Sequence, residues 1–245
     1  MDSERRIAAV TFDCWNTLLR ERDFAHPRER RATALVEAAA AAGVALDETA
    51  AAGAVRAAFD RHLALWMDGV GSGAGEIAQW ALETALVGDA ATRAPALARR
   101  FEDAALEGSV DPLPGAGEVL ETLRSRGVRV ALICDTGMSP GRVVRELLRR
   151  AGLLEHLEVQ IFSNEVGVPK PHPRMFERAL APFGISPSDA VHVGDLRRTD
   201  VHGGRAFGMG TVRIRGVFDD TAALPDADAV VDAHADLLET LASLG

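Results

Sequence analysis

The apolar residues of this 245-residue chain follow two kinds of pattern. Short, nearly continuous apolar runs, such as IAAVTF at positions 7–12, are typical of strands buried in a parallel sheet. Between about residues 27 and 106, apolar residues recur at helical spacing among Ala, Glu and Arg. The pattern predicts a first strand followed by an all-helical segment, with breaks at Gly43, in the loop 68–76 and near Gly88.

After a turn and a helix that extend to Gly127, strand-like and helix-like runs alternate. The expected strands are VRVALIC, EVQIFS, AVHVGD and GTVRI, with helical patterns between them. Such alternation is typical of βαβ units in a parallel sheet. We therefore predict an α/β core formed by residues 1–20 and 108–245, and an inserted all-helical domain formed by residues 21–107. Within that domain, we expect one apolar stripe to be interior: Phe59, Leu63, Trp66 and Met67.

Several chemically active side chains follow the predicted strands directly. They are Asp13, Cys134, Asp135 and Asp195. In open parallel sheets, ligands bind in the crevice beyond the carboxyl ends of the strands. We therefore expect these side chains to share one crevice, in which a carboxylate such as Asp13 can act as a nucleophile and form a covalent intermediate.

The composition of the chain argues against nucleic acid and membranes as partners. Acidic residues outnumber Lys and Arg by 36 to 27, giving a net charge of -9, which disfavours nucleic acid. No run reaches the roughly 18 to 20 apolar residues that span a bilayer, so we expect no membrane partner. The two cysteines are too few for a disulfide framework, and the N-terminus lacks the apolar stretch of a secretion signal. We therefore expect a cytoplasmic protein. We interpret the histidines without metal-ligand spacing as structural: His26, His62, His172, His192 and His202.

Four segments in order resemble the motifs of the haloacid dehalogenase superfamily: FDCWNT, LICDTG, VPKPHPRMF and HVGDLRRTD. Members of that superfamily share a strand-end nucleophilic Asp, a Ser or Thr, a Lys and an acidic pair. The resemblance implies a Rossmann-like three-layer core with a parallel sheet, and a helical cap inserted between the first and second motifs. It also implies that Asp13 is the nucleophile, that Lys170 supplies an ammonium, and that Thr17 orients the free oxygen of Asp13 or helps to close its loop.

The resemblance further implies a Mg²⁺ cofactor. A hard cation would be held by the oxygens of Asp13, Asp195 and Asp200 together with the backbone carbonyl of Trp15. Such a cation would offset the negative charge of a phosphoryl group under attack by a carboxylate. For Asp200, a second interpretation is that it caps the start of a helix.

The first motif departs from the superfamily's phosphatases at Trp15. Phosphatases carry a second Asp there, which protonates the leaving oxygen, and positioned proton transfer contributes roughly 10²- to 10⁴-fold. Dehalogenases of the superfamily resemble this chain in having an aromatic residue, Tyr, at that place. They differ in using no metal, in having Ser at the position of Asp195, and in having Tyr at the position of Phe176.

The second motif departs as well. The phosphate-binding Ser or Thr of the superfamily falls on Cys134, although Thr136 is close enough to take that role. A thiol is a weak donor. Asp135 is either a substitute proton carrier or an ordinary turn residue. We therefore group Trp15 with Cys134, Asp135 and Thr136 as expected substrate-binding residues.

Three functions follow from these observations. The first is Mg²⁺-dependent hydrolysis of a small phosphorylated metabolite through an aspartyl-phosphate intermediate. The second is metal-independent hydrolysis of a small 2-haloacid. The third is a protein that keeps the fold and binds phosphate or metal with little turnover. In each case the partner is a small molecule, and both a monomer and a homodimer stay open.

Overall fold

The computed structural model describes residues 7–245 and divides the chain into two compact units. The core unit contains the chain up to Arg20 together with Asp111–Asp135 and Leu148–Gly245. The helical unit contains Glu21–Val110 and Thr136–Leu147. Segment 136–147 therefore belongs to the helical unit, although it separates two strands of the core in sequence. Whether the helical unit acts as a cap stays a prediction.

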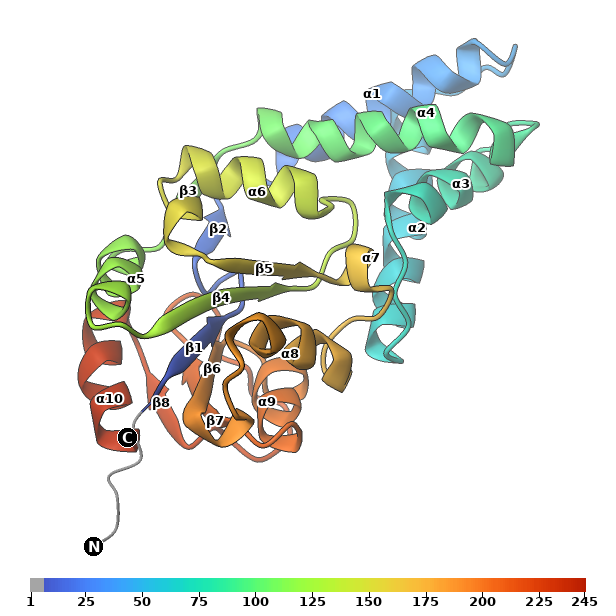
Figure 1. Cartoon of the computed structure of the whole chain (residues 1–245). Coiled ribbons are helices and arrows are strands. Elements are labelled where there is room, and N and C mark those ends of the chain that lie inside the picture. Colours follow the sequence, from blue (N-terminus) through green and yellow to red (C-terminus); the bar gives the residue numbers. More distant parts are fainter. Residues whose placement is uncertain (1–6) are drawn as a thin grey trace, which may run out of the picture. The chain divides into compact units, whose positions relative to one another are not determined.

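The core unit is built on a parallel six-stranded sheet with the order β5-β4-β1-β6-β7-β8 (Figure 1). In the central strand, Val10 pairs with Val130 on one side and Val191 on the other. All four residues of β1 are buried, because both faces of the sheet are covered. The strands are β1 (Ala9–Phe12), β4 (Arg129–Cys134), β5 (Val159–Phe162), β6 (Ala190–Gly194), β7 (Gly210–Ile214) and β8 (Ala229–Val231).

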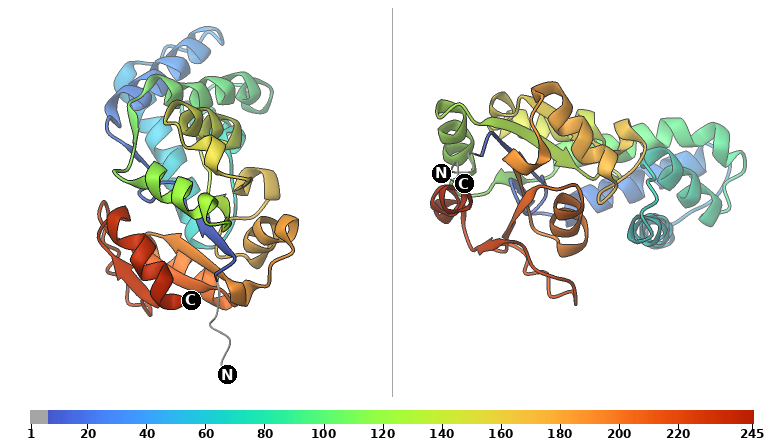
Figure 2. Two further views of the ribbon diagram at one scale, coloured as in Figure 1. Left: turned by 60° about the vertical axis from the view of Figure 1, so that its left-hand side comes forward. Right: turned by 60° about the horizontal axis from the view of Figure 1, so that its bottom comes forward.

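Helices cover the two faces of this sheet. On one face, Ala131 and Ile133 pack in a cluster with Met175 and Phe176 of α8 (Pro173–Leu180). The helices α5 (Ala116–Ser125) and α10 (Leu237–Leu244) lie side by side in each view of Figures 1 and 2. The remaining helices that follow strands are α6 (Gly141–Arg150), which begins in the helical unit, α7 (Ser163–Val166) and α9 (His202–Ala206).

The helical unit consists mainly of four helices that share one hydrophobic cluster. The cluster is rich in alanine and includes Leu35, Ile77, Leu82 and Phe101. The Asp47 carboxylate accepts a hydrogen bond from the Ala50 backbone, 2.7 Å away, and so caps the second helix. The helices are α1 (Ala25–Ala40), α2 (Glu48–Met67), α3 (Ala74–Thr84) and α4 (Ala90–Asp103).

Short elements complete the fold. Two strands, β2 (Leu19–Glu21) and β3 (Val110–Pro112), form a separate two-stranded sheet. Single helical turns lie at η1 (Ala104–Glu107), η2 (Leu154–His156), η3 (Ala181–Phe183), η4 (Pro187–Asp189), η5 (Arg197–Val201) and η6 (His234–Asp236). Within residues 7–245, no helix has both the length and the apolar character needed to span a bilayer.

The predicted α/β fold is confirmed, and so are the breaks of the helical segment. The prediction that the apolar stripe of α2 is interior is wrong in part. Leu63 and Met67 are 39% and 57% exposed, so the last two turns of α2 present apolar side chains to solvent. The spacing of apolar residues predicts an apolar face of a helix, but it does not show whether other residues cover that face.

Candidate active site

Three carboxylates meet at the carboxyl edge of the sheet. Asp13 directly follows β1, Asp195 directly follows β6, and Asp200 lies in the turn η5. Because β1 and β6 are hydrogen-bonded parallel neighbours, their carboxyl ends lie side by side. All three side chains are buried, and an oxygen of each lies within 4.8 Å of the others. The structure thus brings together the three side chains expected to hold a metal.

Lys170 joins this cluster from the loop before α8. Its Nζ donates to Asp13 Oδ1 and to Asp200 Oδ1, both at 2.6 Å, and the side chain is almost completely buried. Its backbone N–H donates to Asp135 Oδ1 at 2.8 Å. Burial alone would lower the pKa of Lys170, but the charges of Asp13 and Asp200 hold it well above its usual value. Lys170 is therefore an ammonium in direct contact with Asp13.

The three carboxylates differ in the charge that their surroundings favour. Burial raises the pKa of Asp13 to about 7, against the opposing effect of Lys170. Burial, together with the charges of Asp13 and Asp200, raises the pKa of Asp195 to about 8. Burial would also raise the pKa of Asp200, but Lys170 and His192 hold it below its usual range. The single ammonium of Lys170 does not neutralise three ionised acids, and a further cation would relieve their repulsion.

The donor set fits a magnesium ion. Mg²⁺ takes oxygen ligands, with one or two carboxylates in a typical protein site. Within residues 7–245, Asp13, Asp195 and Asp200 form the only group of three His, Cys, Asp or Glu side chains that are close enough to share an ion.

His192 was expected to be structural, yet it contacts the cluster. Its Nδ1 is hydrogen-bonded to Thr11 Oγ1, 2.7 Å away. Its Nε2 is hydrogen-bonded to Asp200 Oδ1 at 3.1 Å. The second oxygen of Asp200 accepts from the backbone N–H of Leu196 at 3.0 Å. These contacts hold the Asp200 carboxylate in one orientation.

Gly194 leaves room for that carboxylate. A Cβ atom at position 194 would lie 2.3 Å from Cγ of Asp200, which is far inside van der Waals contact. The HVGD segment therefore supplies an orienting histidine and an obligatory glycine besides its aspartate. Strand alternation was the available signal, because His192 and Gly194 share one face of β6.

Asn16 is a second residue that sequence analysis missed. Its Nδ2 donates to Asp195 Oδ2 at 3.2 Å, and its backbone has a left-handed φ of 60°. Asn is among the residues that adopt this conformation most readily. The signal was its place between Trp15 and Thr17 in the first motif.

The other first-motif residues lie where the loop leaves β1. Trp15 is half-buried, and its backbone forms an isolated bridge with Leu19. Thr17 is fully buried, and its hydroxyl has no hydrogen-bond partner among residues 7–245. The structure therefore gives Thr17 no hydrogen bond to the Asp13 carboxylate.

The second-motif residues occupy the end of β4 and the loop after it. Cys134 is fully buried, and its thiol donates to the carbonyl of Asp135 at 3.3 Å. A hydrogen bond with Cys14, together with burial, holds the pKa of the Cys134 thiol well above its usual value, so it is protonated at neutral pH. Thr136 is buried and is the first residue of segment 136–147 in the helical unit.

The chain is similar in sequence to two known phosphatases. The chain is 41% identical over 115 residues to a phosphoserine phosphatase from Thermus thermophilus, covering 46% of this chain and 45% of that protein. It is 37% identical over 102 residues to a glyceraldehyde 3-phosphate phosphatase from Pyrococcus abyssi, covering 41% of each. The chain thus spans about half the length of the curated relatives it matches.

A solved structure resembles the whole chain. The 2-haloacid dehalogenase of Pseudomonas syringae pv. Tomato superposes with a TM-score of 0.69 at 22% identity, covering 98% of this chain and 100% of that one. At this identity the likeness concerns the fold. Residues 7–208 match the family described as haloacid dehalogenase-like hydrolase, which is more than half of the chain. The strand-end carboxylates, the buried lysine and this match together show that the protein is a member of the haloacid dehalogenase-like hydrolases.

Proposed function

We propose that the protein is a Mg²⁺-dependent phosphatase that hydrolyses a small phosphate monoester through a covalent intermediate on Asp13. The observation that carries the proposal is the convergence of Asp13, Asp195 and Asp200 with the ammonium of Lys170. A metal-free halide displacement needs a nucleophile but has no use for two further buried carboxylates beside it. Phosphoryl transfer needs positive charge at the same place.

The chain's own groups perform two transfers. An oxygen of Asp13 attacks phosphorus, the phosphorus–ester oxygen bond breaks, and the leaving oxygen keeps the bonding electrons and takes a proton from water. Water then attacks the aspartyl phosphate, releasing inorganic phosphate and restoring the Asp13 carboxylate. Lys170 Nζ, 2.6 Å from Asp13 Oδ1, holds the nucleophile and places a positive charge beside the phosphoryl oxygens. When bound, Mg²⁺ would supply further positive charge to those oxygens.

The supporting residues have positional roles in this proposal. Asn16 orients Asp195, and His192 orients Asp200. Asp135 binds the backbone of Lys170, which supports a role in positioning the lysine rather than in proton transfer. Thr17 and Thr136 stay candidates for contacts with the transferred group. Cys134, as a buried thiol, offers only a weak donor.

We propose small phosphorylated three-carbon metabolites as the first substrates to test. The two relatives described above are named for phosphoserine and for glyceraldehyde 3-phosphate, which both have a three-carbon chain. In this proposal the helical unit serves as a cap that selects the substrate and excludes water. We further propose a cytoplasmic enzyme that acts on a small molecule as a monomer or homodimer.

Trp15 favours a second candidate function, the hydrolysis of a small 2-haloacid. Halide departs without a proton, so a site that lacks an acid two residues after the nucleophile meets no obstacle in this reaction. The second candidate requires Asp13 to attack carbon and requires no metal. Metal dependence therefore separates the two.

Calorimetric titration with Mg²⁺ tests the proposal. We expect one site in the native protein and a loss of at least tenfold in affinity in Asp195→Asn, which keeps the side-chain shape but removes a charged ligand. Glu177→Gln removes one exposed carboxylate on α8 and should bind Mg²⁺ as the native protein does. Equal affinity in the native and Asp195→Asn proteins would move the metal elsewhere, and no binding by either would favour the haloacid reaction.

A further inference from the structure

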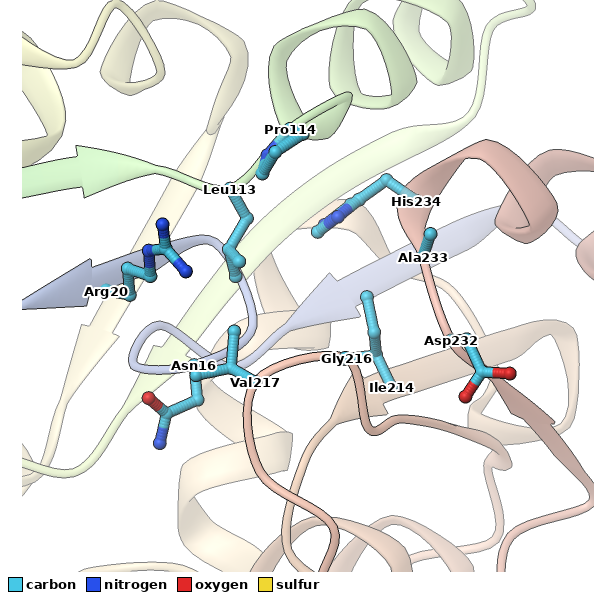
Figure 3. A pocket seen from close by; sticks show the side chains of 10 residues that line it. All are labelled: Asn16, Arg20, Leu113, Pro114, Ile214, Gly216, Val217, Asp232, Ala233 and His234. Atoms are coloured by element: carbon cyan, nitrogen blue, oxygen red, sulfur yellow. The ribbon is translucent and has the colours of Figure 1, made fainter.

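A cavity lies in the core unit and is lined in part by Asn16, from the loop that follows Asp13. Its volume is about 230 Å³, below the roughly 300–1,000 Å³ of pockets that hold drug-sized ligands. Figure 3 shows side chains from four separate stretches of the chain gathered around it. They are Asn16, Arg20, Leu113, Pro114, Ile214, Gly216, Val217, Asp232, Ala233 and His234.

His234 supplies an unsatisfied hydrogen-bonding atom to this cavity. The side chain is only 2% exposed, and in Figure 3 its ring points from η6 toward the centre of the cavity. Its Nε2 has no hydrogen-bond partner among residues 7–245. A buried polar atom that lacks a partner destabilises the fold, so a ligand that satisfies it would gain from the contact.

The tautomer of His234 determines whether the ligand atom that meets Nε2 must be a hydrogen-bond donor or an acceptor. The ring forms a hydrogen bond with the backbone of Thr17, which uses Nδ1 because Nε2 has no partner. That bond raises the pKa of His234, as donation to a carbonyl does, but burial lowers it more, to about 4. At neutral pH the ring is therefore uncharged, with Nδ1 protonated and Nε2 as an acceptor. The matching ligand atom is a hydroxyl or amine donor.

Arg20 supplies charge to the same cavity. It is exposed, and its guanidinium takes part in none of the ion pairs formed within residues 7–245. The acidic residue on the wall, Asp232, is already paired with Arg215, with Nε and Oδ1 2.6 Å apart. Positive charge thus remains available for a bound anion. The rest of the wall is largely apolar, formed by Leu113, Ile214 and other aliphatic side chains.

From these contacts we infer that the cavity is a binding site for a small organic anion that also carries a hydroxyl or amine donor, with the anion at Arg20 and the donor at His234 Nε2. Guanidinium binds carboxylate or phosphate through two parallel hydrogen bonds. The aliphatic wall contacts the carbon atoms between the two polar ends. Hydroxy acids and amino acids of a few carbon atoms have this pattern.

The occupant of this cavity would touch the loop that carries the nucleophile. Asn16 lines the cavity and donates to Asp195, and the Thr17 backbone holds the His234 ring. Both residues lie within four positions of Asp13. A ligand that binds here is therefore in contact with groups that orient the catalytic carboxylates, at a site of its own.

Protein-observed NMR titration with D-glycerate and with propionate tests the inference. Both probes carry a carboxylate, and only glycerate carries hydroxyl donors. We expect glycerate to shift the amide signals of Gly216, Val217 and Ala233 and to bind about tenfold more tightly than propionate, because a hydrogen bond to a buried acceptor is worth about this factor.

Variants assign the contacts. Arg20→Gln changes an exposed side chain and should weaken both probes about tenfold or more, whereas Arg178→Gln, a matched exposed arginine on α8, should change neither. His234→Asn keeps an amide donor for the Thr17 backbone but lacks Nε2, so it should reduce glycerate binding to the level of propionate. Three results would each overturn the inference: no shifts around the cavity, equal binding of the two probes by the native protein, or undiminished binding by Arg20→Gln.

Discussion

Trp15 is the residue at which the proposed chemistry meets its clearest obstacle. Its half-buried indole follows the proposed nucleophile, Asp13, by two positions and has no group that protonates a leaving oxygen. Asp135 accepts a hydrogen bond from the Lys170 backbone, which supports a role in positioning the lysine. The native protein should therefore hydrolyse activated aryl phosphates, whose leaving groups need little protonation, better than alkyl phosphates.

We predict that Trp15→Asp raises turnover of alkyl phosphates, by up to the roughly 10²- to 10⁴-fold that positioned proton transfer provides. Aryl phosphates should gain least. The measurement is kcat for one alkyl and one aryl ester in both proteins. Thermal melting comes first, because replacing a large side chain leaves a cavity that costs a few kcal/mol. A well-folded variant without any gain on alkyl phosphates would contradict the missing-acid explanation.

His234 gives a prediction about pH and stability. Its pKa is about 4 in the folded protein, lowered by burial, against an ordinary value of about 6.5. Below pH 6.5 the unfolded chain takes up a proton that the folded protein does not, so stability falls as pH falls from 6.5 to 4. Between pH 7 and pH 5 this group should cost about 2 kcal/mol of unfolding free energy.

Denaturant unfolding at the two pH values, in the native protein and in His234→Asn, measures this effect. The other buried histidines contribute equally to both proteins, so the difference isolates His234. We expect the variant to lose about 2 kcal/mol less than the native protein between pH 7 and pH 5. Parallel losses in the two proteins would show that His234 takes up a proton freely in the folded state.

At the scale of elements, β6 and the turn after it fix the positions of Asp195 and Asp200. The strand delivers Asp195, and η5 turns the chain back so that Asp200 lies over Gly194. The strand and both acids were predictable from the apolar run and the motif. The bonds of His192 and Asn16 were not, because each joins residues whose proximity depends on strand register and on a left-handed backbone position.

Gly194→Ala tests this arrangement. The new Cβ would displace the Asp200 carboxylate, so we expect a loss of about 1–3 kcal/mol in unfolding free energy and weaker Mg²⁺ binding. Gly53→Ala is the matched control, because Gly53 lies inside α2 with no atom near the position of the new Cβ. That change should stabilise the protein by about 0.5–1 kcal/mol. If the two substitutions changed the unfolding free energy and Mg²⁺ binding alike, the close approach of Asp200 to Gly194 would be contradicted.

Smaller elements escaped sequence analysis for physical reasons. Strand β8 has three residues in a polar stretch, too few to show a periodic pattern, and its pairing with β7 depends on the rest of the sheet. At the end of α2 the pattern was present but misleading, because the apolar stripe there is partly exposed to solvent.

At the scale of the whole molecule, the strand order decides which distant residues meet. Strands β1 and β6 are neighbours although nearly 180 residues separate them, and this places Asp13 beside Asp195. The general rule that ligands bind beyond the carboxyl ends of parallel strands was enough to predict that site. The cavity lined by His234 and Arg20 was beyond prediction, because its walls come from four short stretches without a shared motif.

The central claim is that Asp13 attacks phosphorus with the help of Mg²⁺, and one set of rates tests it most directly. Release of inorganic phosphate from O-phosphoserine and glyceraldehyde 3-phosphate is measured with Mg²⁺ and with EDTA, beside release of chloride from 2-chloropropionate, in the native protein and in Asp13→Asn. We predict phosphate release that requires Mg²⁺, is abolished in Asp13→Asn, and is accompanied by no chloride release. Chloride release that persists in EDTA and is lost in Asp13→Asn, without phosphate release from either ester, would contradict the claim and identify a dehalogenase.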